Sequence, residues 1–337
     1  MFIYACPEMH SQFLSHHQYG FSMGFLKQEQ VYLFIVGSSN GLVLCTASKM
    51  LTDMYYVCNP LTKKWVLLPP PLIQHIWVAT GFICNDECVS SSSRISTSYK
   101  VIRIPINMEA SKFKVEIFSS DLGKWNVYDV SYPLDATWGY SFNEKLVTHN
   151  GVCYRFQKEK RNLLAFSISR NNNDGACGND CRSIDLPDRA KDEEHWDDLK
   201  QYLGESEGLI CYAIVNESER SLSVWVLEED WYLMHKDIEF DNTIAEMESS
   251  FNGGAGADDI FSQIQVLGFN PVDKNVVILS YKKCIWSYNF RTRGYEQLSH
   301  VPPLGSKISM SHMSETFSSK PTFALKPTPT TLPPVTW

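Results

Sequence analysis

Residues 37–41 read Gly-Ser-Ser-Asn-Gly and match the letters of a nucleophile elbow, Gly-x-Ser-x-Gly. That elbow presents a catalytic serine only where a strand leads into it and a helix follows it. Here residues 41–45, Gly-Leu-Val-Leu-Cys, favour a second strand. Glycine and asparagine also supply the backbone angles that tight turns need. We therefore interpret the motif as a turn between strands, with hydrolase chemistry as the alternative.

Two cysteine pairs have a spacing that could offer thiolates to zinc, namely Cys84 with Cys88 and Cys177 with Cys181. Zinc sites combine closely spaced ligand pairs with partners at matching separations. These two pairs lie far apart in the sequence and have no histidine pair nearby. We therefore expect no metal and no other cofactor, and redox-labile loop cysteines are the alternative.

Most of the other cysteines lie inside apolar runs, which is typical of small, reduced core side chains. They are Cys45, Cys58, Cys153, Cys211 and Cys284. Residues 1–7 lack the basic and apolar regions of a secretory signal. The Asn216-Glu217-Ser218 glycosylation triplet is therefore interpreted as a turn. We expect a cytoplasmic or nuclear protein, since reduced thiols suit those compartments.

Charge and hydropathy limit the classes of partner. The net charge of −8 and the pI of about 5.6 disfavour nucleic acid, because an acidic surface repels phosphates. No apolar run approaches the ~20 residues of a membrane span. Residues 192–198, Asp-Glu-Glu-His-Trp-Asp-Asp, could bind a cation or a basic peptide, and a solvated helix or loop face is the alternative.

A repeated pattern of short strands organises the chain. Each unit holds three runs rich in Val, Ile, Tyr, Phe or Trp, separated by polar turns. The units comprise residues 41–68, 99–130, 151–186, 208–235 and 275–298. In four of them an aromatic follows the last turn, namely Trp65, Trp125, Trp231 and Tyr295. Residues 191–203 are the best candidate for a helix.

The repeat predicts sheets that stack on one another. A meander of three or four strands has two apolar faces and cannot bury both alone. Radial stacking buries face against face and leaves only short edges exposed. We expect the aromatic after each turn to pack between neighbouring blades.

The first unit carries a specific resemblance. Residues 39–42 read Ser-Asn-Gly-Leu, residues 59–65 read Asn-Pro-Leu-Thr-Lys-Lys-Trp, and residues 68–71 read Leu-Pro-Pro-Pro. This pattern resembles the first blade of the plant F-box-associated, kelch-related domain, and weaker matches extend over about residues 10–300. The resemblance implies an all-β propeller of kelch-like four-stranded blades. We expect six blades, closed by a strand around residues 31–36 that pairs with late strands.

The same resemblance implies a role. In that family an F-box docks on a Skp adaptor, and the propeller holds a client protein for ubiquitination by a cullin-based ligase. Residues 1–36 lack the Leu-Pro-rich helical pattern of an F-box. A truncated gene model, a fragment and a stand-alone propeller are all compatible with that difference. We expect Skp and cullin to bind only if an F-box lies upstream.

We divide the chain into three parts. Residues 1–30 would follow the missing F-box, residues 31–317 would form the propeller, and residues 318–337 a Pro- and Thr-rich disordered tail. The predicted function is client recognition without chemistry, through loop aromatics such as Trp77, Trp138 and Trp196. One alternative is a stand-alone or decoy interaction module. Another is a sugar-binding or enzymatic propeller, which would need a convergent polar pocket.

Overall fold

The computed structural model describes fifteen segments of the 337-residue chain. They are residues 34–39, 42–46, 54–59, 64–74, 78–87, 96–105, 112–131, 146–157, 161–167, 181–187, 199–216, 221–239, 264–270, 272–281 and 284–300. Within them the regular structure consists of antiparallel strands, grouped into five sheets of four strands each. The strands fall into two compact units, β1–β12 and β13–β20, divided after Asp185.

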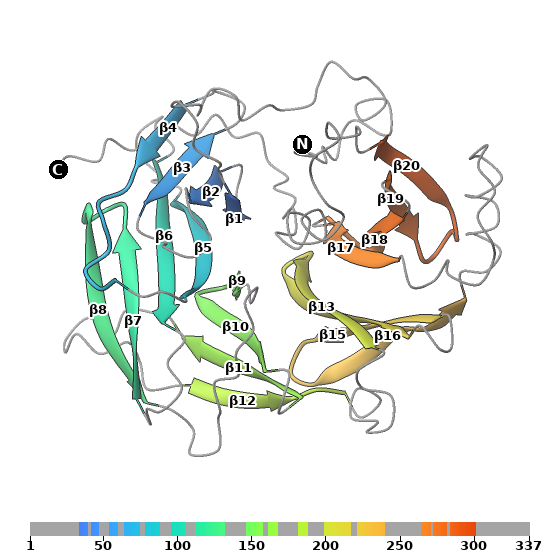
Figure 1. Cartoon of the computed structure of the whole chain (residues 1–337). Helices are drawn as coiled ribbons and strands as arrows, with labels where there is room; N and C mark the ends of the chain where they lie inside the picture. Colours follow the sequence, from blue (N-terminus) through green and yellow to red (C-terminus); the bar gives the residue numbers. More distant parts are fainter. Residues whose placement is uncertain are drawn as a thin grey trace. The chain divides into compact units, whose positions relative to one another are not determined.

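The first unit contains three sheets, each an antiparallel meander in chain order (Figure 1). The first sheet consists of β1 (Phe34–Ser39), β2 (Leu42–Thr46), β3 (Tyr55–Asn59) and β4 (Lys64–Leu67). The second consists of β5 (Val78–Glu87), β6 (Ser96–Pro105), β7 (Lys112–Ser119) and β8 (Lys124–Ser131). The third consists of β9 (Val147–His149), β10 (Val152–Gln157), β11 (Asn162–Ser167) and β12 (Cys181–Asp185).

The second unit contains two sheets of the same topology (Figure 1). One consists of β13 (Leu199–Ser206), β14 (Leu209–Asn216), β15 (Ser221–Leu227) and β16 (Trp231–Glu239). The other consists of β17 (Gln265–Asn270), β18 (Asp273–Tyr281), β19 (Cys284–Asn289) and β20 (Tyr295–His300).

Apolar clusters join neighbouring sheets within each unit. In the first unit, one cluster joins the first sheet to the second, and another joins the second sheet to the third. In the second unit, one cluster joins both sheets. Within each unit the first strands of successive sheets are neighbours: β1 lies beside β5, β5 beside β9, and β13 beside β17. This face-to-face burial is the arrangement that the repeat predicted.

Glycine permits the close approach of these first strands. A Cβ atom on Gly81 of β5 would lie 3.0 Å from Thr148 Cγ2 and 3.2 Å from Leu146 Cβ. On Gly204 of β13 it would lie 2.7 Å from Tyr202 Cε1 and 3.0 Å from Phe269 Cδ2. Real Cβ atoms almost never approach as closely as 2.7 Å, so a side chain at Gly204 would displace Tyr202, whereas at Gly81 the neighbours would have to shift by a few tenths of an ångström.

The predicted strands are confirmed, and the strand expected around residues 31–36 overlaps β1, but the first strands of the other four sheets, β5, β9, β13 and β17, were missed. The expected units correspond to β2–β4, β6–β8, β10–β12, β14–β16 and β18–β20. Residues 191–203 were interpreted as a helix, and this is wrong for residues 199–203, which begin β13 and pair with β14. Residues 191–198 lie outside the described residues. Tertiary pairing overrides the local helical pattern here.

The predicted closure of the fold is also wrong for the N-terminal strand. β1 pairs with β2 as the first strand of its own sheet, from Phe34↔Thr46 to Ser39↔Leu42. A meander pairs strands that are adjacent in sequence, which minimises the loop that must close. The described residues supply five four-stranded sheets, and six blades stay a prediction.

The aromatics that follow the repeated turn differ in their packing. Trp125 is buried between the first two sheets, and Tyr295 packs against the cluster of the second unit. Trp65 remains 37% exposed and meets Tyr56 edge-on at 5.8 Å between ring centroids. Its neighbour Val66 packs on the first cluster, so the alternation of a strand turns Trp65 to the opposite face. The expectation that it fills an interface between described sheets is wrong.

Candidate functional site

The segment after β4 leaves the first sheet as Leu68-Pro69-Pro70-Pro71. Leu68 is buried, and its N–H donates to the carbonyl of Tyr55 at 2.8 Å, which extends the pairing by one residue. The three prolines have no N–H to donate and so cannot continue a ladder. Strand β4 therefore ends at Leu67, and the chain crosses toward β5 as a loop. We call residues 69–74 the Pro69–Gln74 loop.

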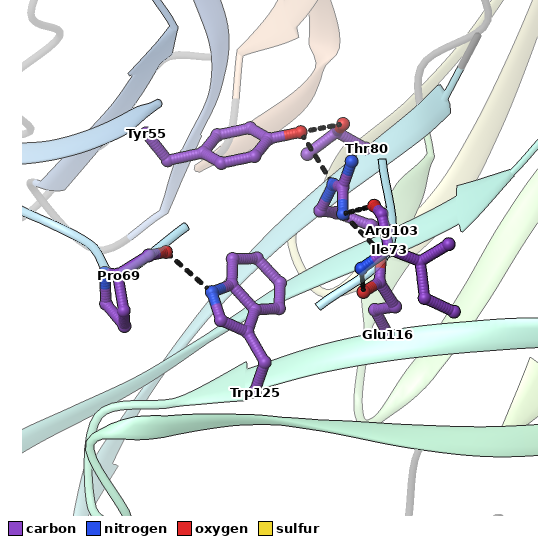
Figure 2. Close-up of polar contacts among 7 residues, drawn as sticks. All are labelled: Tyr55, Pro69, Ile73, Thr80, Arg103, Glu116 and Trp125. Carbon is purple, nitrogen blue, oxygen red and sulfur yellow. Dashed lines mark hydrogen bonds and ion pairs between the residues drawn. The ribbon is translucent and has the colours of Figure 1, made fainter. Parts of the chain in front are cut away.

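A buried ion pair in the second sheet fixes one end of this loop. Arg103 of β6 and Glu116 of β7 are directly opposite each other, and their side chains are 1% and 0% exposed. The Ile73 N–H donates to Glu116 Oε1 at 2.8 Å. Arg103 Nη1 donates both to Glu116 Oε2 and to the Ile73 carbonyl, the latter at 3.2 Å. Both backbone polar groups of Ile73 are thus held by one pair of charges (Figure 2).

A tryptophan fixes the other end. The Trp125 indole N–H donates to the Pro69 carbonyl at 2.8 Å (Figure 2). The Arg103 guanidinium carbon lies 5.7 Å from the Trp125 ring centroid, within the range of a cation–π contact. Arg103 and Trp125, which anchor the two ends of the loop, are therefore in contact with each other in the interior.

Two further side chains connect this group to the first sheet. Arg103 Nε donates to the Tyr55 hydroxyl at 3.2 Å, and that hydroxyl lies 3.2 Å from Thr80 Oγ1. Tyr55 belongs to β3 and Thr80 to β5, so the network joins both sheets of this interface. A buried charge is tolerated only when it is paired and hydrogen-bonded, and the network meets that requirement.

The fixed loop presents an apolar side chain to solvent. Leu72 is 63% exposed, the highest value among the large hydrophobic residues whose exposure is described. Pro70 and Gln74 are exposed as well, whereas Pro69, Pro71 and Ile73 are half-buried. A loop that displays an apolar group from a rigid scaffold is suited to recognition of another molecule.

The aromatics predicted as recognition residues, Trp77, Trp138 and Trp196, all lie outside the described residues. Trp77 follows Gln74 by three positions in the same connection between β4 and β5. The prediction for Trp77 itself stays untested, and the structure describes only how residues 69–74, which precede it, are held. Sequence reasoning missed Arg103 and Glu116. The available signal was a charged residue inside each of two apolar strands, Val101–Ile104 and Val115–Phe118.

The sequence motifs that suggested chemistry do not form a reactive centre in the described part of the chain. Residues 37–39 end β1 and β2 begins at Leu42, so a strand and not a helix follows the motif, which excludes the nucleophile-elbow alternative. Ser39 Oγ accepts the Cys84 N–H at 3.1 Å. Searching the described residues finds no group of three or more His, Cys, Asp or Glu side chains placed to hold a metal ion. Residues 192–198 lie outside the described residues.

Four of the five cysteines predicted to lie in the core have described side chains, and all four are buried. Cys45, Cys58, Cys153 and Cys211 are buried free thiols, as predicted. The Cys284 side chain lies outside the description. Burial raises the pKa of Cys211 to about 12. Cys84 and Cys181 are half-buried free thiols, and their suggested partners Cys88 and Cys177 lie outside the described residues.

Burial likewise raises the pKa of Cys181 to about 11. A thiol with so high a pKa is a poor nucleophile and a poor metal ligand, because both roles need the thiolate.

Across the described residues, no helix has the length and apolar composition needed to cross a bilayer.

Comparison with known proteins gives the family. The family model "F-box protein At3g26010-like, beta-propeller" matches residues 14–322. A putative F-box protein of Arabidopsis thaliana, At3g23970, is 27% identical over 205 residues, which cover 58% of this chain and 48% of that protein. The F-box protein At5g07610 of the same plant is 25% identical over 302 residues, covering 84% of this chain and 67% of that protein.

The chain spans about half the length of the first of these relatives. Among solved structures, that of AztD from Citrobacter koseri aligns over 80% of this chain and 70% of its own, at 8% identity and a TM-score of 0.36. That score is too low to support an inference. The family match covers every described strand, and the four-stranded sheets are the blades that it requires. The chain therefore belongs to the At3g26010-like β-propeller family of F-box proteins.

Proposed function

We propose that the chain is the client-binding part of an SCF-type ubiquitin ligase. The observation that carries this proposal is that residues 14–322 match a family of F-box proteins. The curated relatives are themselves named F-box proteins. A propeller in such a protein holds a client while a separate enzyme transfers ubiquitin, so its contribution is proximity.

The structure supports a binding role at the Pro69–Gln74 loop. The loop is anchored by hydrogen bonds at Pro69 and Ile73, and it displays Leu72. The proposal assigns no catalysis to this chain, and it places the protein in the cytoplasm or nucleus. The proposal also includes six kelch-like blades, and recruitment of Skp and cullin only if an F-box is present upstream.

Affinity purification from plant cells tests the proposal. The tagged chain is expressed, and the proteins that co-purify are identified by mass spectrometry. A specific client recovered with the chain would support the client-binding role. Recovery of a Skp adaptor and cullin as well would mean that the chain docks on them without a recognisable F-box, whereas a client recovered without them is the result for a propeller that binds but does not recruit. Absence of any specific protein, together with a stoichiometric metal in the purified chain, would favour a sugar-binding or enzymatic propeller.

A further inference from the structure

The sequence dictates the conformation of the segment 68–71. Proline fixes its own φ near −65° and pushes the residue before it into the extended or polyproline region. Leu68, Pro69 and Pro70 each precede a proline, so these restrictions overlap along the run. Residues 68–71 accordingly belong to neither a helix nor a strand. These restrictions favour the polyproline II conformation for Leu68, Pro69 and Pro70, and the chain then bends at Leu72 and Ile73.

The anchors hold this segment in place. Trp125 binds the Pro69 carbonyl, and Glu116 and Arg103 bind the N–H and carbonyl of Ile73. The residues between these two points have little freedom to rearrange. A segment that is ordered before binding loses less conformational entropy when a partner binds it.

The outward side of the segment is apolar and uncharged. Pro70 and Leu72 are exposed, and Leu67 is 36% exposed. Residues 65–74 read Trp-Val-Leu-Leu-Pro-Pro-Pro-Leu-Ile-Gln and contain no charged side chain. Interior contacts use the Pro69 carbonyl and both backbone groups of Ile73, and neither Pro70 nor Pro71 has an N–H. The partner therefore meets mainly proline rings and a leucine side chain.

We infer that residues 67–72 are a docking element for a protein whose binding groove is lined with aromatic side chains. Grooves of this kind bind preformed polyproline II segments by packing aromatic rings against proline and neighbouring aliphatic side chains. A charged groove without aromatics would find no charge to pair with in residues 65–74. The inference deepens the proposed function, since it rests on a protein-binding role and states the chemistry of the partner.

Purified domains with aromatic-lined grooves test the inference directly. The intact chain is immobilised, and an SH3, a WW and an EVH1 domain are offered in turn as analytes in biolayer interferometry. We expect saturable binding of at least one domain, displaced by an excess of a free proline-rich peptide. The double variant Pro70→Ser/Leu72→Ser should weaken that binding by about tenfold or more, and Leu122→Ser should leave it unchanged.

Leu122 is a matched control, because it is a leucine with 51% exposure in the turn between β7 and β8 and has no proline beside it. Urea unfolding midpoints show whether each variant is folded. Failure of all three domains to bind would overturn the inference, as would equal binding by the double variant and the parent chain. Client capture in cells is scored separately. If the double variant captures the client as the parent does, residues 67–72 are not the docking element, and the proposed client-binding function is unaffected.

Discussion

Arg103 and Glu116 face each other across β6 and β7, and together they hold both backbone polar groups of Ile73 in a different part of the chain. Each charge is almost completely buried. The pair thus joins sheet to loop, and the loop conformation depends on two residues of the second sheet. The first prediction follows from this dependence.

Removing one charge of the pair should destabilise the protein strongly. The substitution Glu116→Gln leaves the Arg103 guanidinium buried without a counter-charge. Breaking a buried ion pair in this way costs about 3–5 kcal/mol in free energy of unfolding. Urea denaturation, followed by tryptophan fluorescence, measures the loss. An unchanged midpoint would show that the pair contributes nothing to the fold.

The control for this prediction lies in the same sheet and shares strand β7 with the buried pair. Lys114 and Asp129 form an ion pair across β7 and β8 at 3.1 Å, with side chains 55% and 69% exposed. Exposed pairs contribute about 0–1 kcal/mol, so Asp129→Asn should barely shift the midpoint. A shift as large as that of Glu116→Gln would mean that burial is not the cause.

Replacing both charged residues of the pair distinguishes their effect on the stability of the fold from their effect on the position of the Pro69–Gln74 loop. In Arg103→Met/Glu116→Leu no charge is left unpaired, and such replacements are often neutral for stability. The double variant should therefore have a higher urea unfolding midpoint than Glu116→Gln. Since Ile73 loses both of its partners, the loop should become protease-sensitive, and limited proteolysis with mapping of cleavage between residues 69 and 74 detects this. An equally resistant loop would show that Trp125 and packing alone hold it.

Trp125 and Trp65 occupy equivalent positions after the repeated turn but should respond differently to the same change. Trp125→Phe removes the N–H that donates to Pro69 and should cost about 1 kcal/mol in free energy of unfolding. Trp65→Phe changes a side chain that is 37% exposed and should cost less than half as much. Urea midpoints of the two variants compare them. A larger loss for Trp65 would contradict the assignment of Trp125 as the interior anchor.

The buried thiols should be unreactive in the folded chain. Burial raises the pKa of Cys211 to about 12 and that of Cys181 to about 11, so both stay protonated at pH 8. A hydrogen bond with Cys45 and burial also raise the pKa of Cys58. Iodoacetamide at pH 8 should leave Cys58 and Cys211 unlabelled until urea is added, as peptide mass spectrometry would show. Rapid labelling of Cys211 without urea would contradict its place in the core.

Acid should weaken the second unit through His235. Burial lowers the pKa of His235 below 6.5, although a hydrogen bond with Asn275 acts in the opposite direction. Its ring lies 4.4 Å from that of Phe290, centroid to centroid. As the pH falls below about 6.5, the unfolded chain binds a proton before the folded chain does, so stability decreases. At higher pH both states are neutral and the effect disappears.

Urea midpoints at pH 7.5 and pH 5.5 test the role of His235. Carboxylates also contribute to the change between these pH values, and they contribute equally in the parent and in His235→Gln. We expect the parent to lose more stability than the variant on acidification. An identical loss in both would assign the whole pH dependence to other groups.

The repeat in the sequence predicted the second, third and fourth strands of each sheet, because these strands carry strong apolar patterns. Val224 and Trp225 of β15, for example, lie in a run of seven residues that are all buried. Two of the first strands, β9 and β13, lack such runs. β9 has only three residues, and β13 reads Leu-Lys-Gln-Tyr-Leu-Gly-Glu-Ser, which resembles a helix as much as a strand. Their strand conformation comes from pairing with the next strand, and a single sequence does not show that pairing.

The candidate site was predictable in its apolar part and not in its polar part. The Leu-Pro-Pro-Pro run at residues 68–71 was visible as a pattern. The bond from Glu116 to Ile73 spans 43 positions along the chain, and the bond from Trp125 to Pro69 spans 56. Separations of this size depend on how two sheets stack, which the spacing of residue types does not encode.

The distance in sequence between the loop and its anchors has a consequence for engineering. Moving residues 69–74 into a relative would transplant the proline run without Arg103, Glu116 or Trp125, unless these were carried over as well. The smallest portable unit is therefore the first two sheets together, residues 34–131. Variation of Leu72 within this frame would change the displayed side chain and leave its support intact, which makes position 72 the natural starting point for altering partner choice.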